Sequence, residues 1–113
     1  MGADDGATVF KHKRKTDATG ESFDSYASCI PYERNGRVEI LVTGANYMTA
    51  HDPKSGDEKW RFCINPEEKE YMRHIPTPVV HDDVIYGVVS RGGDVFALRP
   101  KGEGLLGDES VVW

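Results

Sequence analysis

Four histidines and two cysteines are the residues of types used most often for metal binding and nucleophilic catalysis. They are His12, His51, His74 and His81, with Cys29 and Cys63. None of them is spaced as His-x-x-x-His or Cys-x-x-Cys, the arrangements that bring two ligands onto one metal ion. We therefore expect no metal site, and we interpret the histidines as solvated or locally hydrogen-bonded side chains.

Nucleophilic chemistry has no recognisable motif either. The sequence contains no Gly-x-Ser-x-Gly elbow, no phosphate-binding glycine loop and no His-Glu-x-x-His segment. Cys29 and Cys63 fall in the first and last strands of one predicted sheet, at opposite edges. We therefore expect two buried thiols with no disulfide between them.

Charge and length exclude further classes of protein. The chain has 113 residues, enough for one small domain, and a formal net charge of −5 from 14 basic and 19 acidic side chains. Nonspecific binding to nucleic acid is disfavoured, because it needs clustered Lys and Arg. The one basic run, at 11–15, is interpreted instead as part of an outer strand, where lysines at an edge discourage wrong pairing. No apolar run approaches the roughly 20 residues of a membrane helix. The acidic start lacks the apolar core of a signal peptide.

The elements that must position these residues are predicted to be strands. Short runs rich in β-branched residues lie at 38–42 and 84–89, next to the turn sequences Asn35-Gly36 and Asp82-Asp83. Further strands are predicted at 60–64 and 111–113, and no window has a 3.6-residue period. The predicted fold class is all-β and predominantly antiparallel. The nearly continuous apolar runs predict that both faces of these strands are covered by neighbouring sheets.

An internal repeat organises the strands. A shift of 47 residues places Ala50 on Ala97 and matches strand with strand and turn with turn. Each copy closes on a strand that contains a tryptophan, Trp60 or Trp113, and residues 7–10 match residues 110–113 with Phe10 in the tryptophan position. The sequence thus predicts a spare fourth strand at 1–16, a first unit at 17–64, and a second unit at 65–113 that lacks most of its fourth strand.

The end of the first unit reads Ala50-His51-Asp52-Pro53-Lys54-Ser55-Gly56-Asp57-Glu58-Lys59-Trp60. It resembles the tryptophan docking motif of PQQ-like β-propeller repeat proteins, Ala-x-Asp-x-x-Thr-Gly-x-x-x-Trp, with serine in the threonine position. The resemblance implies a closely packed alanine, a turn closed by the aspartate and the serine, a glycine that reverses the backbone, and a tryptophan that covers the neighbouring blade. The structural positions that it implies are Ala50, Asp52, Ser55, Gly56 and Trp60.

The second unit has a degenerate motif, which keeps Ala97 and Trp113 but has Arg99 in the aspartate position and a longer turn at 102–107. The resemblance implies four-stranded propeller blades, two per chain, permuted at the fourth strand. Two blades do not close a propeller, which has about four to eight of them. We therefore expect three or four copies to close one ring head to tail by strand exchange, with Phe10 and Trp113 at the junction between chains.

The function that the resemblance implies is a non-enzymatic scaffold or binding module. Loops at blade ends carry function on a rigid framework, so a protein or peptide ligand is expected at one end of the blades. The candidate residues there are Asn46, Arg73, His74 and Arg91.

The alternative function is a fragment of a PQQ-dependent, quinoprotein-like oxidoreductase whose catalytic residues lie elsewhere. The chain lacks the pair of adjacent cysteines that many quinoproteins place against the quinone, and its tryptophans take docking positions. Neither PQQ nor Ca²⁺ is therefore expected as a cofactor. Relatives in this family are usually exported, whereas this sequence predicts no export signal, so the compartment stays open.

Overall fold

The computed structural model of the chain describes residues 14–19, 27–66, 77–88 and 95–113. This part of the chain is all-β, as the sequence predicts, and contains no α-helix. Its elements are β1 (Ile30–Arg34), β2 (Arg37–Gly44), β3 (Tyr47–His51), β4 (Glu58–Cys63), β5 (Val79–His81), β6 (Val84–Val88), β7 (Val95–Leu98), β8 (Gly104–Leu105) and a 3₁₀ helix at Asp108–Ser110.

The first sheet is an antiparallel meander from β1 to β4, extended by β8 at its outer edge. Asn35 and Gly36 connect β1 to β2 with φ angles of 52° and 75°, which is the two-residue turn that suits the twist of a hairpin. Ala45 and Asn46 connect β2 to β3, again with positive φ at both residues. The turn residues predicted from the sequence therefore take the positions expected of them.

The second sheet consists of β5, β6 and β7, also antiparallel, with Asp82 and Asp83 in the turn between β5 and β6. Residues 111–113 lie along the free edge of β7. There the Ala97 N–H donates to the Trp113 carbonyl at 2.8 Å, and the Val112 N–H donates to the Ala97 carbonyl at 2.7 Å.

One pairing is not expected from the sequence. Strand β8 belongs to the long turn of the second unit, yet it pairs in parallel with β4, which places Leu105 beside Arg61. The Leu106 N–H adds a hydrogen bond of 2.8 Å to the Arg61 carbonyl. The second unit thereby covers the outer edge of the first sheet, an edge that would otherwise present unpaired backbone groups.

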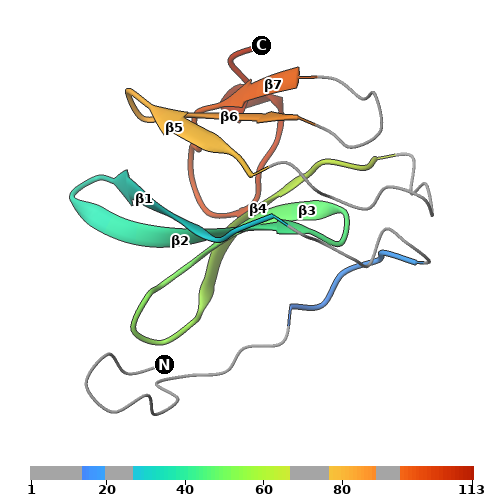
Figure 1. Ribbon diagram of the computed structural model, residues 1–113, viewed down its shortest axis with the longest axis horizontal. Coiled ribbons are helices and arrows are strands. Elements are labelled where there is room, and N and C mark those ends of the chain that lie inside the picture. Colours follow the sequence, from blue (N-terminus) through green and yellow to red (C-terminus); the bar gives the residue numbers. More distant parts are fainter. Residues whose placement is uncertain (1–13, 20–26, 67–76, 89–94) are drawn as a thin grey trace.

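The two sheets stack face to face around one shared core (Figure 1). The Phe62 and Phe96 rings meet across the interface, with centroids 5.8 Å apart. The Tyr32 hydroxyl donates to the Asp83 carbonyl at 2.8 Å and so fixes the turn of the second sheet over the first. The buried core residues are Tyr32, Leu41, Met48, Ala50, Trp60 and Ile64 from the first unit, with Ile85, Phe96, Leu98 and Leu106 from the second.

Side-chain alternation gives each sheet an inner face, turned toward the other sheet, and an outer face. Across the first sheet, the inner face carries the row Ile30–Leu41–Ala50–Trp60 and the outer face the row Pro31–Ile40–His51–Glu58. Across the second sheet, the inner row is Val80–Ile85–Leu98, and the outer row is Val79–Tyr86–Ala97, which Trp113 extends.

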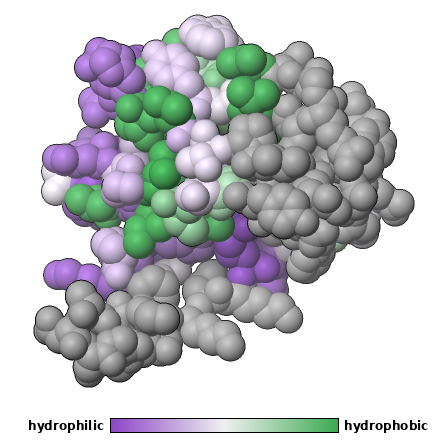
Figure 2. Space-filling view, viewed as in Figure 1, coloured by the Kyte–Doolittle hydropathy of each residue, from purple (hydrophilic) through white to green (hydrophobic). Residues whose placement is uncertain are grey.

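Within one chain, only one face of β2 and of β6 is covered. Val38 on the outer face of β2 is 49% exposed, and Val88 on the outer face of β6 is also exposed. Each sheet has one neighbour within the chain, and this neighbour covers only the inner face. Apolar side chains consequently reach the surface over the second sheet (Figure 2).

Candidate functional site

The docking turn of the first unit is closed by the side chain of Asp52. Its Oδ1 accepts hydrogen bonds from the Lys54 N–H at 2.8 Å and the Ser55 N–H at 3.0 Å, and these bonds hold the pKa of the carboxyl below its ordinary value. The Gly56 N–H donates to the Asp52 carbonyl at 2.8 Å, with Gly56 at a φ of 80° that favours glycine. The turn aligns β4 for its pairing with β3.

Ala50 and Trp60 lie opposite each other across β3 and β4, and both are fully buried. The Trp60 indole Nε1 donates to Glu39 Oε1 at 3.0 Å, and Glu39 is only 4% exposed. Glu39 Oε2 lies 3.4 Å from Arg34 Nη2, and Arg34 Nη1 donates to the Gly102 carbonyl at 2.8 Å. A buried charge pair thus satisfies the indole and connects the motif to the second unit.

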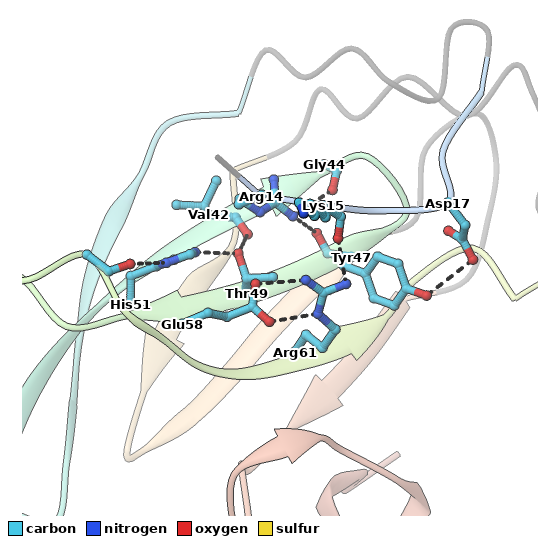
Figure 3. Close-up of polar contacts among 11 residues, drawn as sticks. Arg14, Lys15, Asp17, Val42, Gly44, Tyr47, Thr49, His51, Glu58 and Arg61 are labelled. Atoms are coloured by element: carbon cyan, nitrogen blue, oxygen red, sulfur yellow. Dashed lines mark hydrogen bonds and ion pairs between the residues drawn. The ribbon is translucent and has the colours of Figure 1, made fainter. Parts of the chain in front are cut away.

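Thr49 and His51 form a buried pair on the outer face of β3, shown in Figure 3. His51 Nδ1 lies 3.0 Å from the Gly56 carbonyl, so this nitrogen carries a proton, and Nε2 lies 2.8 Å from the Thr49 hydroxyl. The Thr49 hydroxyl also donates to the Val42 carbonyl at 3.4 Å. Thr49 is fully buried, which leaves a substrate no access to its hydroxyl. The pair therefore has a structural role, and His51 is locally bonded as predicted.

Residues 14–18, which we call the strap, cross the outer face of the first sheet over β3 and β4 (Figure 3). Arg14 Nη2 donates to the Gly44 and Tyr47 carbonyls, each at 3.0 Å, and its burial lowers the pKa of the guanidinium. The Lys15 carbonyl accepts from Arg61 Nη1 at 3.0 Å. Burial tends to raise the pKa of Glu58, but its two hydrogen bonds from Arg61, at 2.7 and 2.9 Å, outweigh this effect and the pKa is lowered.

Asn46 was predicted as a candidate ligand-binding residue, and the structure places its side chain in the interior, 3% exposed. Its amide donates to Asp17 Oδ1 at 2.8 Å, and its Oδ1 accepts from Asn65 Nδ2 at 2.7 Å. Asn46 therefore connects the strap to the segment after β4. The other candidates, Arg73, His74 and Arg91, lie outside the described residues, as do Phe10 and His12.

The degenerate motif of the second unit is built differently. Arg99 is exposed, and the turn is closed instead by the buried hydroxyl of Ser110, whose Oγ accepts from the Lys101 N–H at 2.9 Å. Sequence reasoning missed this serine because it lies outside the spacing of the motif. Ala97 is fully buried, but Trp113 is 59% exposed. In the described part of the chain, the one aromatic ring that Trp113 contacts is Tyr86, with 6.0 Å between the ring centroids.

The two cysteines and His81 lie apart from one another, outside the docking turn and the strap. Cys29 and Cys63 form no disulfide. The prediction of two buried thiols is wrong, because Cys29, which precedes β1, is exposed and Cys63 on β4 is only half-buried. His81 is exposed at the end of β5, with Nε2 at 3.2 Å from Asp82 Oδ2. Within the described ranges, no three His, Cys, Asp or Glu side chains gather as they would around a metal ion.

A shallow groove of about 330 Å³ lies beside the docking turn, lined by Arg37, Val38, Asp52, Pro53 and Lys54.

No helix in the described part of the chain is long and apolar enough to cross a membrane. Comparisons with protein-family models, with curated proteins and with solved structures found no match.

Proposed function

We propose that this chain is a β-propeller-like, non-enzymatic scaffold that assembles with copies of itself into a closed ring. The observation that carries the proposal is that the two sheets present the same docking row, once covered and once bare. The covered row contains Ala50 and Trp60, which are both buried. The bare row contains Ala97, which is itself buried, and Trp113, which is 59% exposed.

The covered row shows what such a surface binds in this protein. Trp60 and Ala50 pack beneath the apolar inner face of the second sheet, where Ile85 and Leu98 belong to the same core. The bare row lies on the outer face of the second sheet, with Ala97 on β7 and Trp113 in the segment that lies along the edge of β7. A further sheet of the same kind therefore fits this surface.

The size and chemistry of the bare surface point the same way. Val79 is 62% exposed, Val95 54% and Trp113 59%, and together with Tyr86 and Val88 they form what we call the free face. Contiguous apolar surface of this kind marks an interaction site, because proteins seldom leave it in water. All five side chains are uncharged, so a partner sheet would bury no ion on them.

A ring follows if the contact is head to tail and the rotation closes, with three or four chains as the proposed number. The match of residues 7–10 to residues 110–113 adds strand exchange at the junction, with Phe10 near the tryptophan position. Loops at the blade ends, including those that carry Arg73, His74 and Arg91, are then the proposed site for a protein or peptide.

Native mass measured by light scattering on a sizing column tests the proposal. It predicts one sharp species at three or four times the chain mass of 12.6 kDa. A folded monomer at high concentration would contradict it. Binding of added PQQ and Ca²⁺ with reduction of a dye would contradict the non-enzymatic part and favour the quinoprotein alternative.

A further inference from the structure

We infer that the free face docks on the outer face of the first sheet of a second copy, over β1 and β2. This inference rests on the proposed self-assembly and names the surface that receives the free face. The receiving face consists of Pro31, Val38, Ile40 and Val42, which are exposed or half-buried in one chain.

The internal interface serves as the template. In the second sheet, the cross-strand row Val80–Ile85–Leu98 is next to the row Val79–Tyr86–Ala97, one residue away along each strand. The side chains of the row Val80–Ile85–Leu98 pack on the first sheet. In the first sheet, the row one residue along from Ala50 is Pro31–Ile40–His51. The two rows correspond openly at β1 and β2, where Pro31 and Ile40 take the places of Val80 and Ile85, whereas His51, in the place of Leu98, is buried on β3. The β1–β2 part of the first sheet of another copy can therefore meet the free face as the second sheet meets the first.

The strap decides which half of the outer face is open. Over β3 and β4 the outer face is polar and covered by Arg14 and Lys15, while Thr49 and His51 are bonded to each other. Over β1 and β2 the outer face is apolar apart from the exposed Glu33 beside Val38, and the strap bonds to it only at the Gly44 carbonyl, at the end of β2, among the described hydrogen bonds. A second copy therefore docks on the β1–β2 half, with the strap at its border.

One contact of the template fixes the register. The Tyr32 hydroxyl, on the inner face of the first sheet, donates to a carbonyl in the β5–β6 turn. The corresponding position of the free face is His81, and the corresponding turn of the receiving copy is Asn35-Gly36. We expect the imidazole of His81 to lie against this turn in the assembly.

The free face could dock either on the receiving face of another copy or on the free face of another copy, and the side chains favour the first arrangement. At the template interface, Trp60 shares one core with aliphatic side chains of the second sheet such as Ile85 and Leu98. The receiving face offers Ile40 in the row that matches Ile85, with Val42 two residues further along β2, whereas another free face would offer a second Trp113 and Tyr86. The two faces are thus complementary rather than identical, which gives a heterologous contact.

Two charged variants and their mixture test the inference. Val95→Lys places a charge on the free face, and Val38→Lys places one on the receiving face. Leu105→Lys is the control, because Leu105 is 69% exposed and lies on β8, at the opposite edge of the first sheet from β1 and β2. Each face variant should raise the dissociation constant of self-association at least tenfold. An equimolar mixture of the two face variants should form a heterodimer, because one intact face remains on each chain, and Leu105→Lys should assemble as the wild type does.

The outcomes separate the two claims. If both face variants assemble like the wild type, the inference is wrong while self-assembly stands. If Val38→Lys assembles fully and Val95→Lys does not, two free faces pair with each other, and the head-to-tail inference is again overturned. A wild-type chain that stays monomeric would refute the proposed function, and the inference with it. Heterodimer formation by the mixture shows at the same time that both variants are folded.

Discussion

The two tryptophans of this chain occupy the same place in two copies of one motif, but their surroundings differ. Trp60 is fully buried, and its indole N–H is bonded to Glu39, whereas Trp113 is 59% exposed. The position in the second sheet that corresponds to Glu39 is occupied by Val84. The second copy of the motif therefore has no acidic side chain that could accept a hydrogen bond from its tryptophan. The difference teaches that the first copy of the motif holds the two sheets together, whereas the second copy leaves its tryptophan at the surface, where we propose that a partner binds.

The largest effect expected from this comparison is the loss of Trp60. Trp60→Ala removes a buried aromatic side chain from the shared core and should lower the free energy of unfolding by about 3–5 kcal/mol. Trp113→Ala should lower it by no more than about 1 kcal/mol, since that ring has one aromatic contact. Urea unfolding of both variants at a dilution that prevents association measures the difference. Equal losses would contradict the division of roles.

The buried acceptor gives the next largest effect. Glu39→Ala leaves the Trp60 N–H and the Arg34 guanidinium without their carboxylate, which should cost about 2–3 kcal/mol of unfolding free energy. Glu33→Ala is the control, because Glu33 is exposed in the neighbouring strand. Thermal and urea unfolding of the two variants should separate them clearly. A neutral Glu39→Ala would mean that the indole does not depend on this bond.

A smaller effect is expected at a pair of corresponding positions where the side chains of the two sheets differ in size. The row Val42–Thr49 of the first sheet corresponds to Gly87–Phe96 in the second, and a Cβ on Gly87 would overlap the Phe96 ring. Gly87→Ala should therefore cost about 1–2 kcal/mol through overpacking. Adding Phe96→Leu to Gly87→Ala should recover part of this loss in urea unfolding, because the shorter side chain makes room. An additive double variant would exclude steric conflict as the cause.

The smallest effect is the charge of the docking turn. Because the folded-state pKa of Asp52 is lowered, its ionised form adds stability that is complete above the unfolded pKa of the carboxyl and is lost as pH falls through the lower folded value. Asp52→Asn keeps an acceptor oxygen but removes the charge. The melting temperature of this variant should lie slightly below that of the wild type at neutral pH, and the two should converge in acid. A constant difference down to low pH would contradict the charge argument.

Much of the fold follows from local signals in the sequence. Turns such as Asn35-Gly36 carry residues that accept positive φ, and the spacing from Ala50 to Trp60 predicts a strand, a turn and a strand in sequence order. These features depend on residues close together in the chain, where composition and spacing contain the physical information. The match of Ala50 with Ala97 likewise predicts two similar sheets.

What could not be predicted depends on contacts between distant segments. A shift of 47 residues matches Leu41 with Val88, but the ladder places Tyr86, two residues earlier, beside Ala97. Register is set by the pairing of the strands and by the length of the connection, which a repeat does not specify. The parallel pairing of β8 with β4 and the role of Glu39 also bring together segments far apart in the chain.

The most direct test of the account is iodide quenching of the two tryptophans in the wild-type chain, measured together with native mass over a range of protein concentrations. In dilute monomer, Trp60 should be protected and Trp113 accessible, as their exposed fractions indicate. On assembly the accessible fraction of the emission should fall toward zero, because the free face is covered by the next copy. An accessible fraction that stays unchanged while the mass rises would show that the chains associate through another surface.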